Sequence, residues 1–233
     1  MRKSILSVLL FVIGIAFAQA QYLNYEIIEK MDYLRTNQMT TNKQSNTVSQ
    51  HKIEGSPYLD DAFVNGTIYT TAKNKVVDVP LRYNIYNDNL EFKTSDGSIL
   101  ELAHPETVER AKMGNTDMIF TDYLTTTENT KQGFFKVLAE GNLILLAKPD
   151  IFYQKAKEEA AFKEAQPPKF IQKPDIYYLQ KPGMPAIKIR KSKDLDEVID
   201  AHKKEISAFI KQNKIKFKQA EDLKQLVEYY NSL

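Results

Sequence analysis

The sequence contains no cysteine, no tryptophan and only three histidines among its 233 residues. Without cysteine no disulfide can form, so stability must come from an ordinary hydrophobic core. Metal ligands are restricted to oxygen atoms and to His51, His104 and His202, which form no closely spaced pair. We therefore predict no metal site and no cofactor. The lack of tryptophan argues weakly against a sugar-binding site.

Sequence motifs for catalysis are also missing. There is no Gly-x-Ser-x-Gly elbow, Gly-rich phosphate loop, dinucleotide fingerprint, calcium loop or His-Glu-x-x-His helix. Acidic residues such as Asp60, Asp61 and Asp78 are scattered, and their spacing assembles no site. We interpret His202 as a half-buried histidine on the apolar side of a helix, where it satisfies a backbone group. We predict no catalytic residue and a protein that is not an enzyme.

The first 20 residues are typical of a cleavable export signal. Arg2 and Lys3 are followed by an apolar run to Phe17 and by Ala-Gln-Ala, so we expect cleavage between Ala20 and Gln21. The run is shorter than the roughly 20 apolar residues of a spanning helix, and no later stretch is longer. The mature chain is therefore expected to be soluble, without a transmembrane segment, and periplasmic or secreted.

Charge is nearly balanced. The precursor has a formal net charge of +2, and loss of Arg2 and Lys3 with the signal would remove that excess. Net charge therefore predicts no nucleic-acid partner.

Residues 51–153 are expected to form an antiparallel β-meander. Short runs of Val, Ile, Thr, Tyr and Phe alternate with turns such as Ser95-Asp96-Gly97-Ser98, whose Asp-Gly pair suits a tight hairpin. Between residues 76 and 86, alternation predicts one apolar face formed by Val77, Val79, Leu81, Tyr83 and Ile85. The expected strands cover residues 66–71, 76–86, 89–94, 99–103, 108–113, 117–124, 133–139 and 142–147.

The flanking segments complete the predicted domain plan. Residues 21–50 are expected to form a short helix from Tyr22 to Met39 and then a polar linker. Residues 154–169 form a charged connector of high helix propensity, either helical or disordered. Residues 170–233 are expected to hold a β-hairpin and two amphipathic helices. The fold class is thus α+β, mainly antiparallel β: a curled meander or partial barrel with two C-terminal amphipathic helices.

The apolar stripes of the two terminal helices are read from periodic positions. Residues of the first stripe fall at steps of three and four from Leu195 to Ile210, and those of the second run from Leu223 to Tyr230. Asp194 and Glu197 have the spacing of a helix cap. These stripes must be buried on the sheet, on each other or in a partner.

The tyrosine doublets are the candidate contact residues for a ligand or partner: Tyr177, Tyr178, Tyr229 and Tyr230. Tyrosine is favoured at interfaces, but one member of a doublet in a strand or helix usually faces the core. The core interpretation is the favoured one.

Several strings together resemble uncharacterised exported proteins of Bacteroidota. They are Gly55-Ser-Pro-Tyr-Leu59, Val79 to Phe92, Tyr177-Tyr178, and the closing segment from Glu221 to Leu233. The resemblance implies a bacterium with two membranes, and it carries over no catalytic residue. The C-terminus differs from the β-rich sorting domain of type 9 secretion in that phylum, which favours the periplasm.

Three functional hypotheses follow. The first is a non-catalytic envelope protein that is structural or binds another protein. The second is a periplasmic carrier whose curled sheet encloses a lipid or other apolar ligand among residues such as Leu81, Tyr83, Phe92, Phe120 and Phe135. The third is a hydrolase with a site that sequence patterns do not reveal.

Overall fold

The structure is a computed structural model that describes residues 26–28, 53–159 and 164–233. The predicted signal, its cleavage point between Ala20 and Gln21, the polar linker and His51 lie outside these residues. The expected helix from Tyr22 to Met39 is wrong at residues 26–28. They form a strand, β1 (Glu26–Ile28), parallel to the first residues of β3.

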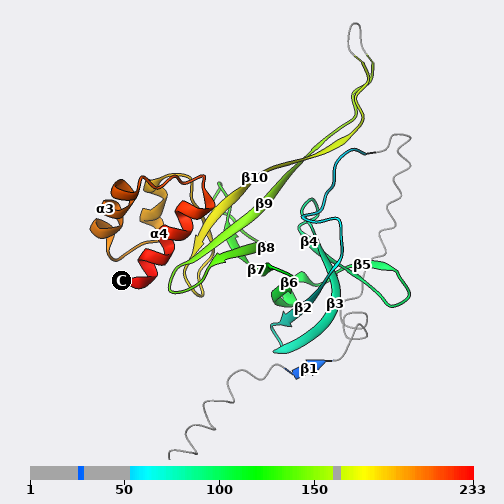
Figure 1. The fold of residues 1–233 in the computed structure, drawn as a ribbon, viewed down its shortest axis with the longest axis horizontal. Coiled ribbons are helices and arrows are strands. Elements are labelled where there is room, and N and C mark those ends of the chain that lie inside the picture. The colour runs from blue at the N-terminus through cyan, green and yellow to red at the C-terminus, as the bar shows by residue number, and fades with distance from the viewer. Residues whose placement is uncertain (1–25, 29–52, 160–163) are drawn as a thin grey trace, which may run out of the picture.

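One large sheet dominates the fold (Figure 1). Its spatial order is β11-β10-β9-β8-β7-β6-β2-β3-β4-β5, with β1 paired to β3, and every other pairing is antiparallel. The prediction of a mainly antiparallel sheet is confirmed. Its strands are β2 (Val64–Thr70), β3 (Asn74–Asn84), β4 (Asn89–Lys93), β5 (Ile99–Glu101), β6 (Val108–Met113), β7 (Thr116–Leu124), β8 (Thr130–Ala139), β9 (Ile144–Gln154), β10 (Lys169–Gln180) and β11 (Ile187–Lys188).

The sheet departs from a single meander at one connection. After β5 the chain passes through the 3₁₀ helix η2 (Pro105–Thr107), and β6 then pairs with β2 instead of β5. Two meanders, β2 to β5 and β6 to β11, are thereby joined side by side. The terminal strands β5 and β11 are not paired to each other, so the sheet is open and not a closed barrel. Register shifts in four strand pairs are bulges that help an open sheet to curl.

A bulge also changes the predicted alternation in β3. The β2–β3 register shifts between Gly66 and Ile68, and Asp78 has a φ of 54°. The extra residue reverses the alternation on its N-terminal side, so that Val76 is buried and Val77 only partly so. Val79, Leu81 and Tyr83 are buried as predicted.

The C-terminal helices cover one face of the sheet beside β9 and β10 (Figure 1). They are the 3₁₀ helix η3 (Ser192–Glu197), α3 (Lys203–Asn213) and α4 (Ala220–Ser232). Their buried residues pack with sheet residues in a single cluster: Leu143, Leu145, Leu179, Leu195, Ile199, Ile206, Leu223, Leu226 and Val227. The predicted pair of amphipathic helices is therefore confirmed, with the sheet as the surface that buries them.

The first predicted helical stripe is interrupted. His202 adopts a φ of 57° and is exposed, so the expectation of a half-buried histidine is wrong. The left-handed backbone conformation of His202 breaks the helical periodicity, and α3 begins at the next residue. Asp194 is the third residue of η3, and its Oδ2 caps the start of that helix by accepting hydrogen bonds from the backbone N–H groups of Arg190 and Lys191. None of the helices in the described ranges is long and apolar enough to cross a membrane.

Strands β9 and β10 form a hairpin that extends far beyond the rest of the sheet (Figure 1). Pairing of β8 with β9 ends at Ala147, whereas β9 and β10 stay paired as far as Gln154 and Lys169. A further bridge joins Lys157 to Gln166. The described parts of the expected connector are thus the two arms of this hairpin and not a helix, because cross-strand pairing outweighs helix propensity here.

Candidate functional site

The two tyrosines of the doublet in β10, Tyr177 and Tyr178, lie on opposite faces of the sheet. Tyr178 is 5% exposed and packs edge to face against Phe135 and Tyr123, at ring-centroid distances of 5.0 and 5.8 Å. Burial raises the pKa of Tyr178 to about 12. Tyr177 points to the opposite face and packs, half-buried, against the helices. Neighbouring residues of a strand alternate between faces, which explains this division.

The second doublet lies on α4. Tyr229 and Tyr230 are both half-buried in the helix-covered cluster, and the ring of Tyr229 stacks on Phe209 at 4.1 Å. The structure therefore brings three of the four candidate tyrosines into one cluster and Tyr178 into another. They do not form a common exposed surface.

The residues expected to line a carrier cavity are packed together instead. Leu81, Tyr83 and Phe92 are buried in one cluster with the partly buried Phe120, whereas Phe135 belongs to a different cluster. An open groove of about 270 Å³ runs beside this core and is lined by residues that include Leu59, Val64, Met113 and Thr116. Ligand pockets usually occupy roughly 300–1,000 Å³, so this groove is small for a lipid.

The exposed face of the projecting hairpin carries a cross-strand apolar pair. Phe152 and Ile171 are direct partners in the β9–β10 register and are 47% and 36% exposed. The ammonium group of Lys173 lies 4.9 Å from the centre of the Phe152 ring. We call Phe152, Ile171 and Lys173 the hairpin patch. It offers apolar area on a rigid strand pair.

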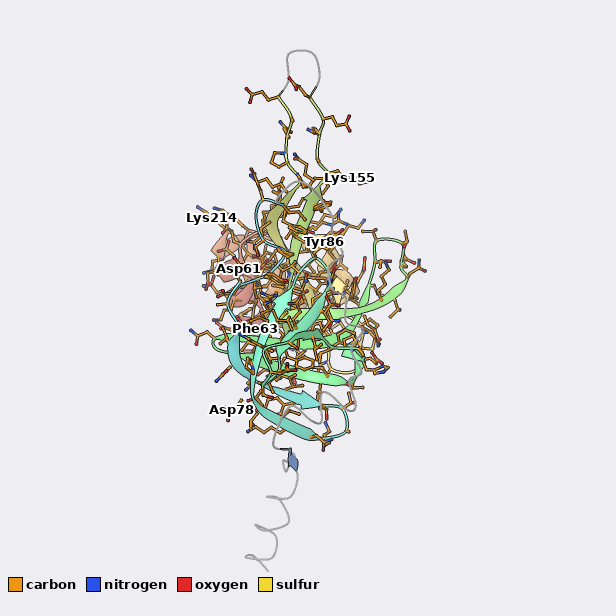
Figure 2. All side chains as sticks on the ribbon, turned by 90° about the vertical axis from the view of Figure 1, so that its right-hand side faces the viewer. Asp61, Phe63, Asp78, Tyr86, Lys155 and Lys214 are labelled. Carbon is orange, nitrogen blue, oxygen red and sulfur yellow. The ribbon has the colours of Figure 1, made fainter. Side chains whose placement is uncertain are left out.

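The opposite face of the hairpin is packed against the body. Tyr153 and Phe170 are cross-strand neighbours whose rings contact each other and that of Tyr86, with centroids 5.1 to 5.9 Å apart. Figure 2 labels Tyr86 near the base of the hairpin and Lys155 farther along its arm. Because one face is occupied by this aromatic cluster, the hairpin patch is the face left open.

A segment preceding β2 anchors the hairpin. The backbone N–H of Glu54 donates to Pro168 O, and the N–H of Phe170 donates to Glu54 O, each at 2.9 Å. Gly55 has a φ of 73°, and a Cβ at this position would lie 2.4 Å from Phe170 O. Only glycine permits this close approach.

Prolines protect the edges of the projecting arms. Pro149 lies in β9 just past its pairing with β8, and Pro174 lies in β10 within the irregular register between Lys173 and Ile176. Proline cannot donate a ladder hydrogen bond, so it discourages addition of another strand. A partner would therefore contact the face of the hairpin more readily than its edges.

Arg82, in β3, is the centre of a group of polar and aromatic contacts, here called the Arg82 cluster. Its guanidinium donates to Glu91 Oε2 from Nε at 2.9 Å and from Nη2 at 2.6 Å, and its carbon lies 3.5 Å above the Tyr58 ring. The second carboxylate oxygen of Glu91 accepts a hydrogen bond from Asn84 at 3.0 Å. Burial and Glu91 raise the pKa of Tyr58. Arg82 and Glu91 are direct partners in the β3–β4 register, and Tyr58 comes from the segment before β2. Sequence reasoning missed these contacts because it did not predict the register of the hairpin.

A second polar group, the Asp88 cluster, is centred on the Asp88 carboxylate. Asp88 Oδ2 accepts from Lys148 Nζ at 2.7 Å, while its Oδ1 accepts from the Tyr83 hydroxyl at 2.7 Å and from the Phe134 backbone N–H at 3.1 Å. Burial and the Asp88 charge raise the pKa of Tyr83 well above its usual value. Lys148 Nζ lies 4.7 Å from the centre of the Phe135 ring. The cluster ties the β3–β4 turn to β8 and β9.

The other polar residues considered from sequence make turn contacts. His104 Nδ1 lies 3.0 Å from Glu106 Oε1 at an exposed position, and Asp60 accepts from the backbone N–H of Ala62. Asp61 accepts a hydrogen bond from the Ser56 hydroxyl, and Asp78 occupies the exposed bulge of β3. These residues are not brought together.

In comparisons with known proteins, no family model, curated protein or solved structure matched this chain.

Proposed function

We propose that this chain is an exported, non-catalytic protein of the bacterial envelope that binds another protein through its projecting hairpin. The observation that carries the proposal is the hairpin patch, in which Phe152 and Ile171 are exposed side by side on arms that extend beyond the sheet. Exposed apolar groups that are held on a rigid element are characteristic of interaction surfaces.

The packing of the helices supports the hairpin as the contact. The stripes of α3 and α4 that the sequence offered for partner binding are covered by β9 and β10, and Tyr178 is enclosed by aromatic rings. Their burial stabilises this chain, so they are not free for a partner without unfolding. The hairpin patch has no such cover in the described part of the chain.

The charges along the hairpin favour a protein partner over a polyanion. Basic Lys155 and Lys157 are followed by acidic Glu158 and Glu159 on one arm, and Glu164 lies on the other. A surface of mixed sign produces little net attraction for nucleic acid or an anionic membrane. It does allow individual ion pairs around an apolar centre, as in protein interfaces.

The proposal is tested by co-purification from the envelope fraction of the native bacterium. We compare the wild type, the Phe152→Ser/Ile171→Thr double variant, and Met184→Ser as a matched control. Met184 is 59% exposed in the turn after β10 and lies outside the patch. Circular dichroism and thermal unfolding must show that all three proteins are folded alike.

We expect a partner protein that co-purifies with the wild type and with Met184→Ser to be lost from the double variant. Equal recovery by all three proteins would place the contact elsewhere. Native mass spectrometry of the same samples provides the opposing result, since a retained small apolar molecule with no protein partner would support a carrier.

A further inference from the structure

We propose that Asp88 and Lys148 join spontaneously in the folded chain to form an amide cross-link, an isopeptide bond between the two side chains. The reacting groups are already in contact, with Lys148 Nζ 2.7 Å from Asp88 Oδ2. They come from the β3–β4 turn and from β9, 60 residues apart in the sequence. The link would close the curl of the open sheet covalently in a protein that has no disulfides.

The close contact between Asp88 and Lys148 depends on the absence of a side chain at residue 133. A Cβ on residue 133 would lie 2.4 Å from Asp88 Oδ2 and 2.6 Å from Lys148 Nζ, so Gly133 in the middle of β8 leaves the space in which the pair meets. Glycine inside a strand weakens it and marks a close approach of other groups. Here the groups that approach are the two reacting side chains.

The reacting pair is largely removed from solvent. The side chains of Lys148 and Asp88 are only 16% and 29% exposed, and the Lys148 ammonium lies 4.7 and 5.3 Å from the ring centres of Phe135 and Tyr123. Aromatic ring faces attract a cation, so these contacts hold the ammonium beside the carboxylate until its proton is transferred. Transfer of one proton from Nζ to Oδ2 along the existing hydrogen bond yields an amine and a carboxylic acid without exchange with solvent.

Two donors are placed to assist the bond-forming step. The Tyr83 hydroxyl and the Phe134 backbone N–H both donate to Asp88 Oδ1, at 2.7 and 3.1 Å. When the Nζ lone pair forms a bond to Cγ, negative charge develops on Oδ1, where these donors stabilise it. Lys148 Nζ also donates to Phe134 O at 3.2 Å, which orients the amine.

The chemistry balances within the chain. The new bond joins Nζ to Cγ, and the bond from Cγ to Oδ2 breaks. Oδ2 leaves as water with its own proton and one from Nζ, so the products are one amide and one water molecule. No oxidant, metal or cofactor takes part. Held groups can react with effective molarities of about 10⁵–10⁸ M, which offsets the slowness of amide formation in solution.

A second lysine–aspartate pair serves as an internal control. Lys136 Nζ lies 2.5 Å from Asp175 Oδ2, and the two side chains are 23% and 25% exposed. Within the described residues, Asp175 accepts no additional hydrogen bond like those that Tyr83 and Phe134 give to Asp88. We expect this pair to remain an ordinary ion pair.

Intact-mass measurement of the exported full chain tests the proposal directly. The expected mass is lower by one water molecule than the encoded mass of the chain that begins at Gln21, and after protease digestion the peptides that contain residues 88 and 148 should be recovered as one branched species. Localisation on that species separates the link from cyclisation of an N-terminal glutamine, which releases ammonia from a different peptide.

Three variants sharpen the result. Lys148→Arg keeps the positive charge but removes the nucleophilic amine, so it should have its encoded mass. Asp88→Asn should lose ammonia in place of water and give the same branched species. Tyr83→Phe should accumulate unlinked chain. Folded wild-type protein at its encoded mass, with the residue 88 and residue 148 peptides recovered separately, would overturn the proposal.

Discussion

Removal of the Arg82 guanidinium should destabilise the fold by several kcal/mol. The side chains of Arg82 and Glu91 are only 13% and 7% exposed, and Arg82→Met leaves the Glu91 carboxylate with the Asn84 amide as its remaining partner. Breaking one side of a buried ion pair typically costs about 3–5 kcal/mol. Loss of stacking on Tyr58 adds to this, since a desolvated cation–π contact contributes about 2 kcal/mol.

Urea unfolding followed by tyrosine fluorescence and circular dichroism measures the effect as a shift of the midpoint at unchanged slope. Arg82→Met/Glu91→Leu should be less destabilised than Arg82→Met, because the double variant contains no unpaired buried charge. Lys73→Met is the matched control, since Lys73 and Glu109 form an exposed pair that should contribute less than about 1 kcal/mol. A cost for Arg82→Met as small as that of the control would refute the reasoning.

Further perturbations test other parts of the structure. Gly55→Ala should detach the hairpin anchor and lower the unfolding midpoint more than Gly97→Ala, because both have positive φ but only residue 55 would clash with backbone. Leu226→Ala should cost about 2–5 kcal/mol in denaturant unfolding, because its side chain is buried between α4 and the sheet. Deletion of residues 193–233 should give a protein that aggregates or unfolds in circular dichroism, because the covered sheet face would be exposed; a folded monomer would contradict this role. The pKa of Tyr178 is raised to about 12, so its contribution to stability is present below about pH 10 and is lost as pH rises toward 12, and Tyr178→Phe should reduce that alkaline decline in unfolding free energy.

Local signals in the sequence predicted local structure well. The Asp96-Gly97 turn lies where a hairpin was expected, with Gly97 at a φ of 85° and Thr94 N–H bonded to Ser98 O. Helix α4 likewise follows the stripe that begins at Leu223. In both cases the determining contacts lie within a few residues, so composition and spacing contain the necessary information.

The pairing of strands that are distant in the sequence could not be predicted from local signals. The partner of β6 is β2 and not β5, and no pattern within Val108–Met113 specifies that choice. The bulge at Asp78 reversed the burial of Val76 and Val77, because one inserted residue shifts the two-residue period. Sequence alternation identifies a strand, whereas its neighbour and its bulges depend on the whole sheet.

The two polar clusters show the same limit. Asp88 and Lys148 are 60 residues apart in the sequence, and only folding places them 2.7 Å apart. The one local hint is Gly133, an isolated glycine inside a strand pattern, which is a recognised sign of a close approach. Gly133 indicates where a close approach occurs, but the sequence does not show which side chains approach it.

The Asp88 cluster also connects the fold to the proposed contact surface. Pairing of β9 with β8 ends at Ala147, so Lys148 is the first residue of the arm that leaves the sheet. The ion pair with Asp88 holds that residue against the β3–β4 turn, and Tyr86 in the same turn packs against the Tyr153 and Phe170 rings of the hairpin. The direction of the hairpin is therefore set at its base. A partner that binds the hairpin patch benefits from this rigidity, since an arm that is already ordered loses less entropy on binding. Loosening the base through Asp88→Ala should consequently weaken partner binding while leaving Phe152 and Ile171 unchanged.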